Sequence, residues 1–302
     1  MASTFLLEIG TEELPADFAR LALPQLQERV QRDLADLRLA HGDVRVSSTP
    51  RRLAVQVKAL AEGQDDLCEE RKGPPVAQAF KDGQPGPAAI GFAKRCGVDP
   101  AALEVRSTPK GDCVFATVHV KGQPALSLLQ DCIPAWIDAL QGRRFMRWGN
   151  GDQRFSRPVR WLVALLGTEI VPVTLPASEP VVQSGRCSRG HRLHPGAVEM
   201  ASADDYDTAL AAVGVHADRQ QRAALIQSSL QERASAFDGA LDCPSGLFEE
   251  LVDLVEDPRI IQGEIADRYL DLPPEVIVTV MQFHQRYAPL TRSGVQPDPL
   301  RL

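Results

Sequence analysis

Short apolar runs and helical repeats alternate along the first part of the chain. Residues 5–9 are mostly apolar, and residues 52–57 alternate between apolar and polar positions, as a β-strand does. Between them, apolar side chains recur at helical spacing, and this set comprises Phe18, Leu21, Leu26, Val30, Leu34 and Leu37. The acids and early proline of residues 11–15 are typical of a helix start. The pattern predicts a strand, a helix and a second strand.

The middle of the chain also contains segments with strand periodicity and segments with helical periodicity. Residues 113–120 and 159–166 are predicted to be strands, the second of them buried, and residues 125–140 are predicted to be a helix. Residues 61–90 differ, because charged residues, glycine and proline dominate them. We expect a loop or a mobile excursion there.

From about residue 204 the strand signals fade, and the pattern becomes helical. The segments with helical periodicity are 217–237, 247–255 and 274–287. Proline, serine and glycine cluster between residues 176 and 196, which is typical of a boundary. The predicted fold class is α+β, with a mixed α/β region over residues 1–180 and a mainly helical region over residues 181–302.

The composition is that of a globular protein, with 44% hydrophobic and 24% charged residues. No apolar run approaches the ~20 residues that cross a bilayer, and the start lacks the charged and apolar segments of an export signal. The six cysteines are far apart with no C-x-x-C pair, which favours reduced thiols. We expect a cytoplasmic protein without a membrane partner. Residues 291–302 stop as an apolar pattern begins, so we also expect a piece of a longer chain.

The net charge of -7 hides an uneven distribution of charge. Residues 1–142 carry 16 basic and 19 acidic side chains, a balance of -3. Residues 143–192 carry nine arginines and three acids, a balance of +6, whereas residues 193–302 carry eight arginines and 18 acids, a balance of -10. The totals exclude a generally basic nucleic-acid coat, but they leave one basic island in an acidic protein.

Aromatic residues are interleaved with the arginines of this island. The aromatics are Phe145, Trp148, Phe155 and Trp161, and the arginines are Arg143, Arg144, Arg147, Arg154, Arg157 and Arg160. Cations that contact phosphates, beside planes that stack on unpaired bases, are what single-stranded RNA requires. The alternative is that the aromatics belong to the core and that the arginines pair with the acidic helical region. Arg51 and Arg52, which follow a turn, are further candidates for a phosphate, although surface arginine pairs are common.

No residue pattern predicts bond chemistry in this chain. Cys187, His191 and His194 have a spacing that zinc ligands use, but neighbouring arginines disfavour a divalent cation, and we predict no metal. The chain contains no G-x-S-x-G, H-E-x-x-H, Walker or dinucleotide motif. We therefore assign no catalytic residue and no cofactor to it.

Several stretches, in one order, resemble the β subunit of the bacterial, heterotetrameric glycyl-tRNA synthetase. They are LLEIGTEELP (6–15), TPRRLAV (49–55), KGPPVAQAF (72–80), GFAKRCGV (91–98), MRWG (146–149), FSRPVRWLVALLG (155–167), GHR (190–192), LVEDPRIIQGEI (254–265) and YLDLPPEVIVTVMQFHQRY (269–287). Each stretch is weak alone, whereas the ordered set is specific. Where the family usually has an aromatic residue, this chain has Leu193, Asp257 and Ala288. These departures indicate differences in packing.

The resemblance implies an α2β2 assembly whose α subunit holds the class II site for glycine and ATP with Mg. The β subunit would bind the tRNA for glycine, with no DNA, and would be needed for aminoacylation. The family's β chain is longer, so this chain resembles its N-terminal portion. An alternative within the same family is a protein-docking module without direct tRNA contact, because the apolar face of residues 272–287 suits a partner groove.

Overall fold

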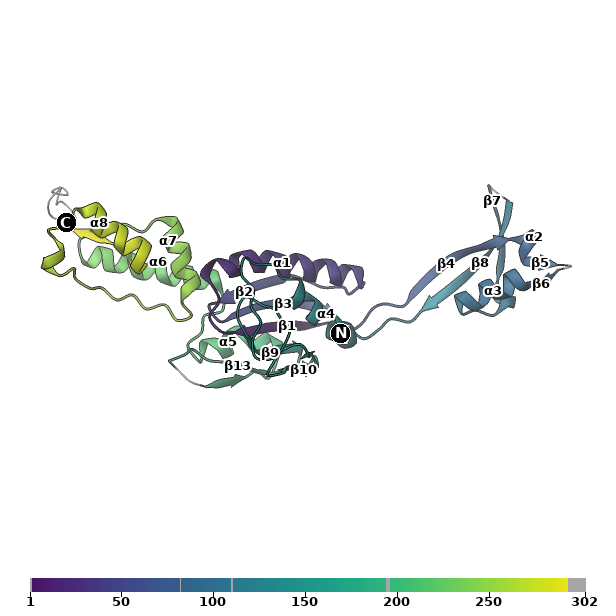
Figure 1. The fold of residues 1–302 in the computed structure, drawn as a ribbon. Coiled ribbons are helices and arrows are strands. Elements are labelled where there is room, and N and C mark those ends of the chain that lie inside the picture. Colours follow the sequence, from purple (N-terminus) through teal and green to yellow (C-terminus); the bar gives the residue numbers. More distant parts are fainter. Residues whose placement is uncertain (1, 82, 110, 194–195, 293–302) are drawn as a thin grey trace.

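A seven-stranded sheet forms the centre of the computed structural model, which describes residues 2–81, 83–109, 111–193 and 196–292 (Figure 1). Its strands lie in the order β11–β12–β9–β1–β3–β2, and β10 pairs with β9. The strands are β1 (Ala2–Thr11), β2 (Val44–Thr49), β3 (Arg52–Ala61), β9 (Val159–Leu166), β10 (Glu169–Ile170), β11 (Thr174–Leu175) and β12 (Val182–Gly185). All pairs are antiparallel except that of β12 with β9. The strands predicted at 5–9, 52–57 and 159–166 are confirmed.

The two faces of β1 support two separate cores, because successive side chains of a strand point to opposite faces. Leu7 and Ile9 pack beneath the helices α1 (Ala16–Asp36) and α4 (Ala125–Ala139), which confirms both predicted helices. Leu6 faces the other way, toward the segment that follows β12. That segment contains β13 (Cys187–Arg189), β14 (Ala197–Glu199), η2 (Ala203–Asp205) and α5 (Tyr206–Ala211).

Gly10 lies where the central strand β1 passes under a tryptophan of its neighbour. Gly10 pairs with Trp161 of β9, and a Cβ atom at Gly10 would lie 1.8 Å from Cε2 of that indole. The absence of a side chain at Gly10 therefore lets Trp161 lie across the strand.

The segment predicted to be a loop, residues 61–90, instead begins a folded module, which we call the projecting module (residues 64–123; Figure 1). It contains a three-stranded sheet in the order β4–β8–β7 with short helices against it. Its elements are β4 (Leu67–Pro75), α2 (Val76–Ala79), β5 (Phe80–Lys81), β6 (Gln84–Pro85), α3 (Pro87–Cys96), η1 (Pro100–Ala102), β7 (Glu104–Thr108) and β8 (Gly111–Val120). The loop prediction is wrong because residues 67–72 of β4 are exposed throughout, so no apolar alternation marks that strand.

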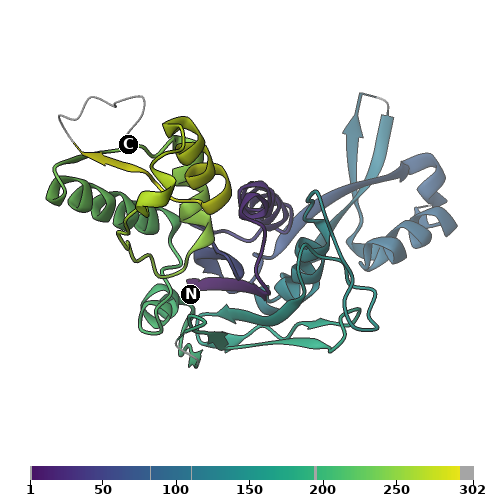
Figure 2. The ribbon, with the colours of Figure 1, turned by 60° about the vertical axis from the view of Figure 1, so that its left-hand side comes forward.

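The C-terminal lobe (residues 218–292) has its own small core around Ile226, Leu230 and Val252. Its elements are α6 (Arg219–Ala236), β15 (Gly239–Leu241), α7 (Ser245–Leu254), η3 (Asp267–Tyr269), α8 (Pro274–Thr279), the π-helical turn η4 (Val280–Gln285) and β16 (Leu290–Arg292). The three helical segments predicted in this part of the chain are confirmed. Figure 2 shows α1 between this lobe and the projecting module.

The predicted boundary at residue 180 falls inside the central sheet rather than between folded parts. β12 lies beyond it and pairs with β9, and Met200, Tyr206 and Leu210 cover the same sheet. The division into residues 1–180 and 181–302 stays a prediction, and the residues that pack on the sheet extend to Ala217. Among the described helices, none is both long and apolar enough to span a bilayer.

Candidate functional site

The first part of the basic island, with five of its six predicted arginines, lies on a long connection between α4 and β9. Residues 141–158 contain no helix and no strand beyond single bridge residues. An antiparallel bridge between Met146 and Phe155 joins the two halves of this connection. The amide of Met146 donates to the carbonyl oxygen of Phe155 at 2.8 Å, and the amide of Phe155 returns a bond of 3.2 Å. The arginines are thus displayed on a folded loop.

The aromatic side chains of the island belong to the core. Phe155 is fully buried, and its ring centroid lies 5.5 Å from that of Phe18 on α1 and 5.9 Å from that of Phe145. Trp148 and Trp161 are also buried. The predicted alternative is therefore confirmed for Trp148, Phe155 and Trp161, since buried rings have no free face on which a base stacks, and the partly buried Phe145 packs against the same core.

Four arginines of the island project into solvent. Arg143 is 81% exposed and lies 3.6 Å from a carboxylate oxygen of Asp17, and Arg147 is 66% exposed and lies 3.4 Å from Asp152. Arg144 and Arg154 are also exposed. The side chains of these last two have no hydrogen bond or ion pair to any described residue. Such exposed, loosely paired guanidinium groups remain available to a phosphate.

The remaining two island arginines are held by neighbours. Arg157 is half-buried and donates to the carbonyl oxygen of Ser156 at 2.8 Å, and Nε of Arg160 donates to Glu12 at 2.8 Å. The carboxylates that the island arginines contact are Asp17, Asp152 and Glu12, and all of them precede residue 193. The hypothesis that these arginines form ion pairs with the acidic helical region is thus wrong: among the described residues, their carboxylate partners lie in other parts of the chain.

A groove of about 480 Å³ lies beside the exposed arginines. Arg143 and Arg154 line it together with two carboxylates, Asp138 and Asp152. Gln153 also lines it, and its side-chain amide donates to Asp138 at 2.6 Å. The groove therefore offers cations, acids and an amide rather than a uniformly positive surface.

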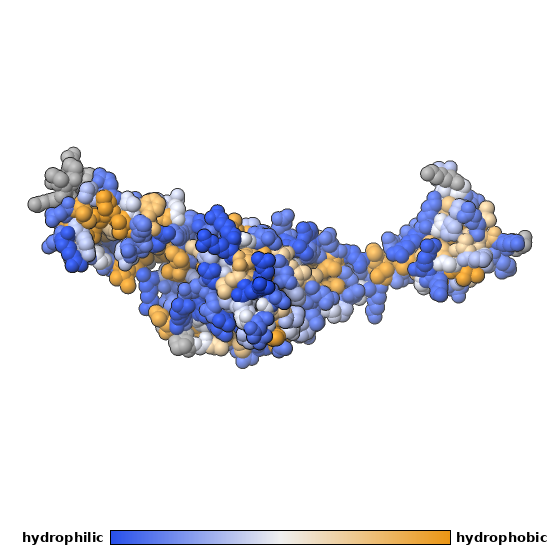
Figure 3. All heavy atoms as spheres, viewed as in Figure 1, coloured by the Kyte–Doolittle hydropathy of each residue, from blue (hydrophilic) through white to orange (hydrophobic). Residues whose placement is uncertain are grey.

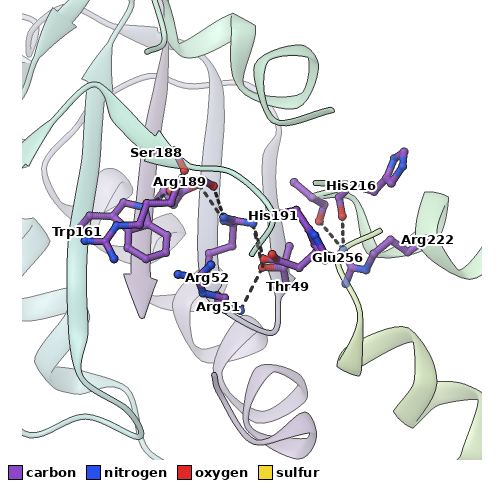
Figure 4. Close-up of polar contacts among 12 residues, drawn as sticks. Thr49, Arg51, Arg52, Trp161, Ser188, Arg189, His191, His216, Arg222 and Glu256 are labelled. Atoms are coloured by element: carbon purple, nitrogen blue, oxygen red, sulfur yellow. Dashed lines mark hydrogen bonds and ion pairs between the residues drawn. The ribbon is translucent and has the colours of Figure 1, made fainter. Parts of the chain in front are cut away.

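Arg52 does not belong with the exposed arginines, because its side chain is fully buried. Nη1 lies 2.6 Å from Oε1 of Glu256, Nη2 donates to the carbonyl oxygen of Arg189 at 2.7 Å, and Nε lies 3.5 Å from Glu8 (Figure 4). The prediction that Arg52 holds a phosphate is corrected: two carboxylates of the protein already occupy it, and solvent does not reach it.

Glu8 completes this buried polar network beneath Trp161. The indole Nε1 and the hydroxyl of Ser188 both donate to Oε1 of Glu8, which is fully buried in β1. Thr49 donates its hydroxyl to Oε1 of Glu256 at 2.6 Å. Burial of these charges carries a desolvation cost that the ion pairs and hydrogen bonds offset. The network joins β1 and β3 to the chain that follows α7.

Arg51, the neighbour of Arg52 in the sequence, is half-buried and also lies near the ring of Trp161. Its Cζ lies 5.6 Å from the indole centroid, and that of Arg189 lies 4.8 Å from it. Burial lowers the pKa of Arg51, an effect that the nearby Glu256 opposes. Arg189 was not a predicted site residue, and its only signal in the sequence was its place in the +6 segment.

The C-terminal lobe is attached by a second set of arginines that the sequence did not single out. Asp253 of α7 lies 3.3 Å from Nε of Arg20 on α1 and 2.7 Å from Nε of Arg219 on α6. Arg222 is fully buried and donates to the carbonyl oxygens of His216 and Ala217, and burial lowers its pKa to about 10. These contacts fix the lobe against the central sheet.

Cys187 and His191, two of the three residues with zinc-like spacing, are not part of a cluster of ligand-type side chains among the described residues. Cys187 is exposed on β13, and the ring Nδ1 of His191 accepts from the amide of Leu193 at 3.3 Å. His194 lies outside the described residues. Where the structure is described, no three His, Cys, Asp or Glu side chains gather as ligands would.

Comparison with known proteins gives the family of this chain. The family model described as "Glycyl-tRNA synthetase beta subunit" matches residues 5–298. The chain belongs to the glycyl-tRNA synthetase β-subunit family. It is 47% identical over 288 residues to a protein of Synechocystis sp. named "Glycine--tRNA ligase beta subunit", a match that covers 95% of this chain and 40% of that protein.

Relatives of lower identity carry the same name. The β subunit of Myxococcus xanthus is 40% identical over 301 residues, which are 99% of this chain and 42% of that protein. The β subunit of Desulfitobacterium hafniense is 40% identical over 291 residues, with 96% and 42% covered. The chain thus spans about 40% of the length of the curated relatives it matches.

The buried network is assembled from stretches that carry the resemblance to the β-subunit family. LLEIGTEELP supplies Glu8, TPRRLAV supplies Thr49 and Arg52, and LVEDPRIIQGEI supplies Glu256. These motifs therefore meet at one joint in the structure. Of the three positions that depart from the family, Leu193 is exposed, Ala288 packs in the lobe core, and Asp257 lies 3.0 Å from Arg259.

Proposed function

We propose that this chain is the N-terminal part of a glycine–tRNA ligase β subunit and supports the ATP-dependent attachment of glycine to its tRNA. In this proposal it binds the tRNA and works in a cytoplasmic α2β2 assembly whose α subunit holds ATP, Mg and the bond chemistry. Membership of the β-subunit family supports the assignment to the ligase. The exposed arginines of the island support the tRNA contact, and they are the observation on which that part rests.

The contact we propose is made with phosphates rather than with bases. Arg143, Arg144, Arg147 and Arg154 are exposed, and the ion pairs that two of them make are exposed too. Exposed ion pairs contribute little to stability, so a phosphate can replace a carboxylate at modest cost. The rings of Trp148, Phe155 and Trp161 are buried and offer no stacking surface, and the partly buried Phe145 packs against the core. Binding through this loop should therefore depend strongly on salt and weakly on base sequence.

The experiment measures the affinity of the chain for the tRNA for glycine as a function of salt concentration. The double variant Arg144→Ala/Arg154→Ala is compared with Arg38→Ala/Arg233→Ala, which removes two other exposed arginines whose side chains make no ion pair or hydrogen bond in the described structure. Affinity falls as salt rises, so the slope of log affinity against log salt is negative. Loss of two phosphate contacts makes this slope shallower by about 1.4–1.8 units. Equal slopes for wild type and the island variant would refute the tRNA contact while leaving the family assignment intact.

A second candidate function, docking onto the α subunit without tRNA contact, is favoured by the surface of the C-terminal lobe. Large apolar side chains gather there (Figure 3), with Ile261 90%, Phe283 69% and Tyr287 59% exposed. Patches of this kind mark interaction sites. The acidic balance of residues 193–302 suits a partner surface with a basic rim.

Co-elution separates the two candidates. If the chain docks, α subunit binds wild type, and Phe283→Ser weakens that binding while tRNA affinity stays unchanged. Ser228→Ala, an exposed change on α6 of the same lobe, is the control. Binding of α subunit without any binding of tRNA would favour docking over the leading proposal.

A further inference from the structure

The projecting module is attached to the central sheet at a single point. Gly63 and Pro124 form an antiparallel bridge there, and the amide of Gln64 donates to the carbonyl oxygen of Gln123 at 3.0 Å. A separate apolar core around Phe92, Val114 and Ala116 holds the module together. Because entry and exit are adjacent and the core is separate, the module stands away from the sheet (Figure 1).

A groove of about 920 Å³ lies in this module between the end of β4 and the helix α3. Its apolar side is formed by Phe92, Pro74 and Pro87. Phe92 lies directly against Gly73, where a Cβ atom would be 2.6 Å from Cε1 of the ring. Glycine at this position thus lets the ring close the groove against the strand.

The charges that line this groove are all positive. Arg71 and Lys72 come from β4, Arg95 comes from α3, and no acidic residue lines the groove. Arg71 lies 3.0 Å from Glu69, with both side chains about half exposed. Lys72 and Arg95 are exposed and have no ion pair or side-chain hydrogen bond within the described parts of the chain. This differs from the island groove, which Asp138 and Asp152 also line.

One of these cations has a structural explanation within its own helix. Arg95 lies in the last turn of α3, where a positive charge is favoured by the carbonyl end of the helix. That explanation does not extend to Lys72, which lies on a strand across the groove. The groove thus has cations on both walls and an apolar side between them. A nucleic-acid backbone matches this arrangement, because its phosphates would contact the cations and its sugars the apolar side.

We propose that the groove between β4 and α3 of the projecting module binds the phosphate backbone of RNA, as a second contact on the tRNA that the island binds. This inference rests on the proposed function. Two basic sites on separately folded parts suit one long polyanion, because each contributes phosphate contacts that a small anion cannot make at both. The groove contributes Lys72, Arg95 and, by exchange of Glu69 for phosphate, Arg71.

The test compares the salt dependence of tRNA binding by four forms of the whole chain. They are wild type, the groove variant Lys72→Ala/Arg95→Ala, the module control Lys81→Ala/Lys121→Ala and the island variant Arg144→Ala/Arg154→Ala. Lys81 and Lys121 are exposed on the same module outside the groove, so the control removes the same charge. The groove variant is expected to lower the slope by about 1.4–1.8 units, with the control unchanged. Equal loss in groove variant and control would refute a specific groove.

A shortened form of the chain keeps the test independent of the folding of the point variants. Residues 65–121 are replaced by a short glycine linker, which the adjacent ends of the module allow. This chain should unfold cooperatively and show at least the slope loss of the groove variant. A wild-type slope in the shortened chain would overturn the inference. It would also be overturned if the groove variant lost affinity for the α subunit while its slope for tRNA stayed at the wild-type value.

The outcomes also separate this inference from the proposed function. A lowered slope in the groove variant with an unchanged slope in the island variant supports the groove and refutes the island. The reverse result refutes the groove alone. Absence of tRNA binding by the wild-type chain refutes both.

Discussion

Nη1 of Arg52 lies 2.6 Å from Oε1 of Glu256, and both side chains are buried although 204 residues separate them in the sequence. This ion pair joins the start of β3 to the start of the chain that follows α7. It is one of the attachments of the C-terminal lobe, beside the ion pair of Arg20 with Asp253.

Loss of that guanidinium group should be more harmful than loss of its partner. Arg52→Met removes the ion pairs of both buried carboxylates, Glu8 and Glu256, whereas Glu256→Gln keeps the pair of Arg52 with Glu8. Breaking a buried ion pair costs about 3–5 kcal/mol of unfolding free energy, and we expect Arg52→Met to reach that range and Glu256→Gln to cost less. Urea unfolding measures both.

An exposed ion pair provides the control for this comparison. Arg160 contacts Glu12 at 2.8 Å with both side chains partly exposed, so Arg160→Met should cost less than about 1 kcal/mol. Equal costs for Arg52→Met and Arg160→Met would show that the buried network does not hold the fold.

A methyl group at residue 10 should disturb the sheet strongly. In Gly10→Ala the new Cβ atom would lie 1.8 Å from the indole of Trp161, so the ring must move away from Glu8 and Ser188. Overpacking of this kind costs about 1–3 kcal/mol, and loss of the indole hydrogen bond adds to it. Thermal unfolding should show a clearly lower midpoint.

Gly91→Ala is the control for Gly10→Ala, because the new methyl group has open space around it. Gly91 lies within α3, and nothing lies within 4 Å of a Cβ atom built there. Alanine is favoured over glycine in a helix by about 0.5–1 kcal/mol, so the stability of the projecting module should rise slightly. A larger loss at Gly91 than at Gly10 would contradict the packing argument.

Asp33 on α1 should make stability depend on acid. Burial tends to raise its pKa, but hydrogen bonds from Arg29 at 2.8 Å and from Trp136 at 2.9 Å outweigh this and hold the pKa below its usual value of 3.8. Because folding favours the ionised form, this contribution is complete above about pH 4 and is lost as the pH falls through the lowered pKa.

The measurement follows the unfolding midpoint from pH 6 to pH 2. Asp33→Asn should lower the midpoint at pH 6 and reduce its fall below pH 4, since the amide does not titrate. Asp131→Asn on α4 is the control, because Asp131 is exposed and makes no side-chain hydrogen bond in the described structure. Parallel curves for wild type and Asp33→Asn would contradict the linkage.

Most of the regular structure follows from local periodicity, and the exceptions have physical causes. The strand β9 begins and ends where its apolar run does, because burial on both faces selects a continuous run. The strand β4 escapes prediction because both of its faces meet water over residues 67–72. Periodicity detects a strand only where one face is apolar.

The site was harder to predict than the fold, because a charge pattern does not say which charges are buried. Arg51 and Arg52 are adjacent in the sequence, yet only Arg52 is enclosed, by carboxylates 44 residues before it and 204 residues after it. The aromatics of the island pack against Phe18 from a distant helix. Long-range partners of this kind follow from the fold alone.

The position of Trp161 makes it an intrinsic optical reporter of the joint between sheet and lobe. Its indole donates to Glu8 and lies within 6 Å of the guanidinium groups of Arg51, Arg52 and Arg189, whereas Trp136 and Trp148 lie in the core on the opposite face. Opening of the joint changes the charges around one tryptophan and spares the other two. A chain in which Trp136 and Trp148 are phenylalanine would then report that opening through its emission, without an attached dye.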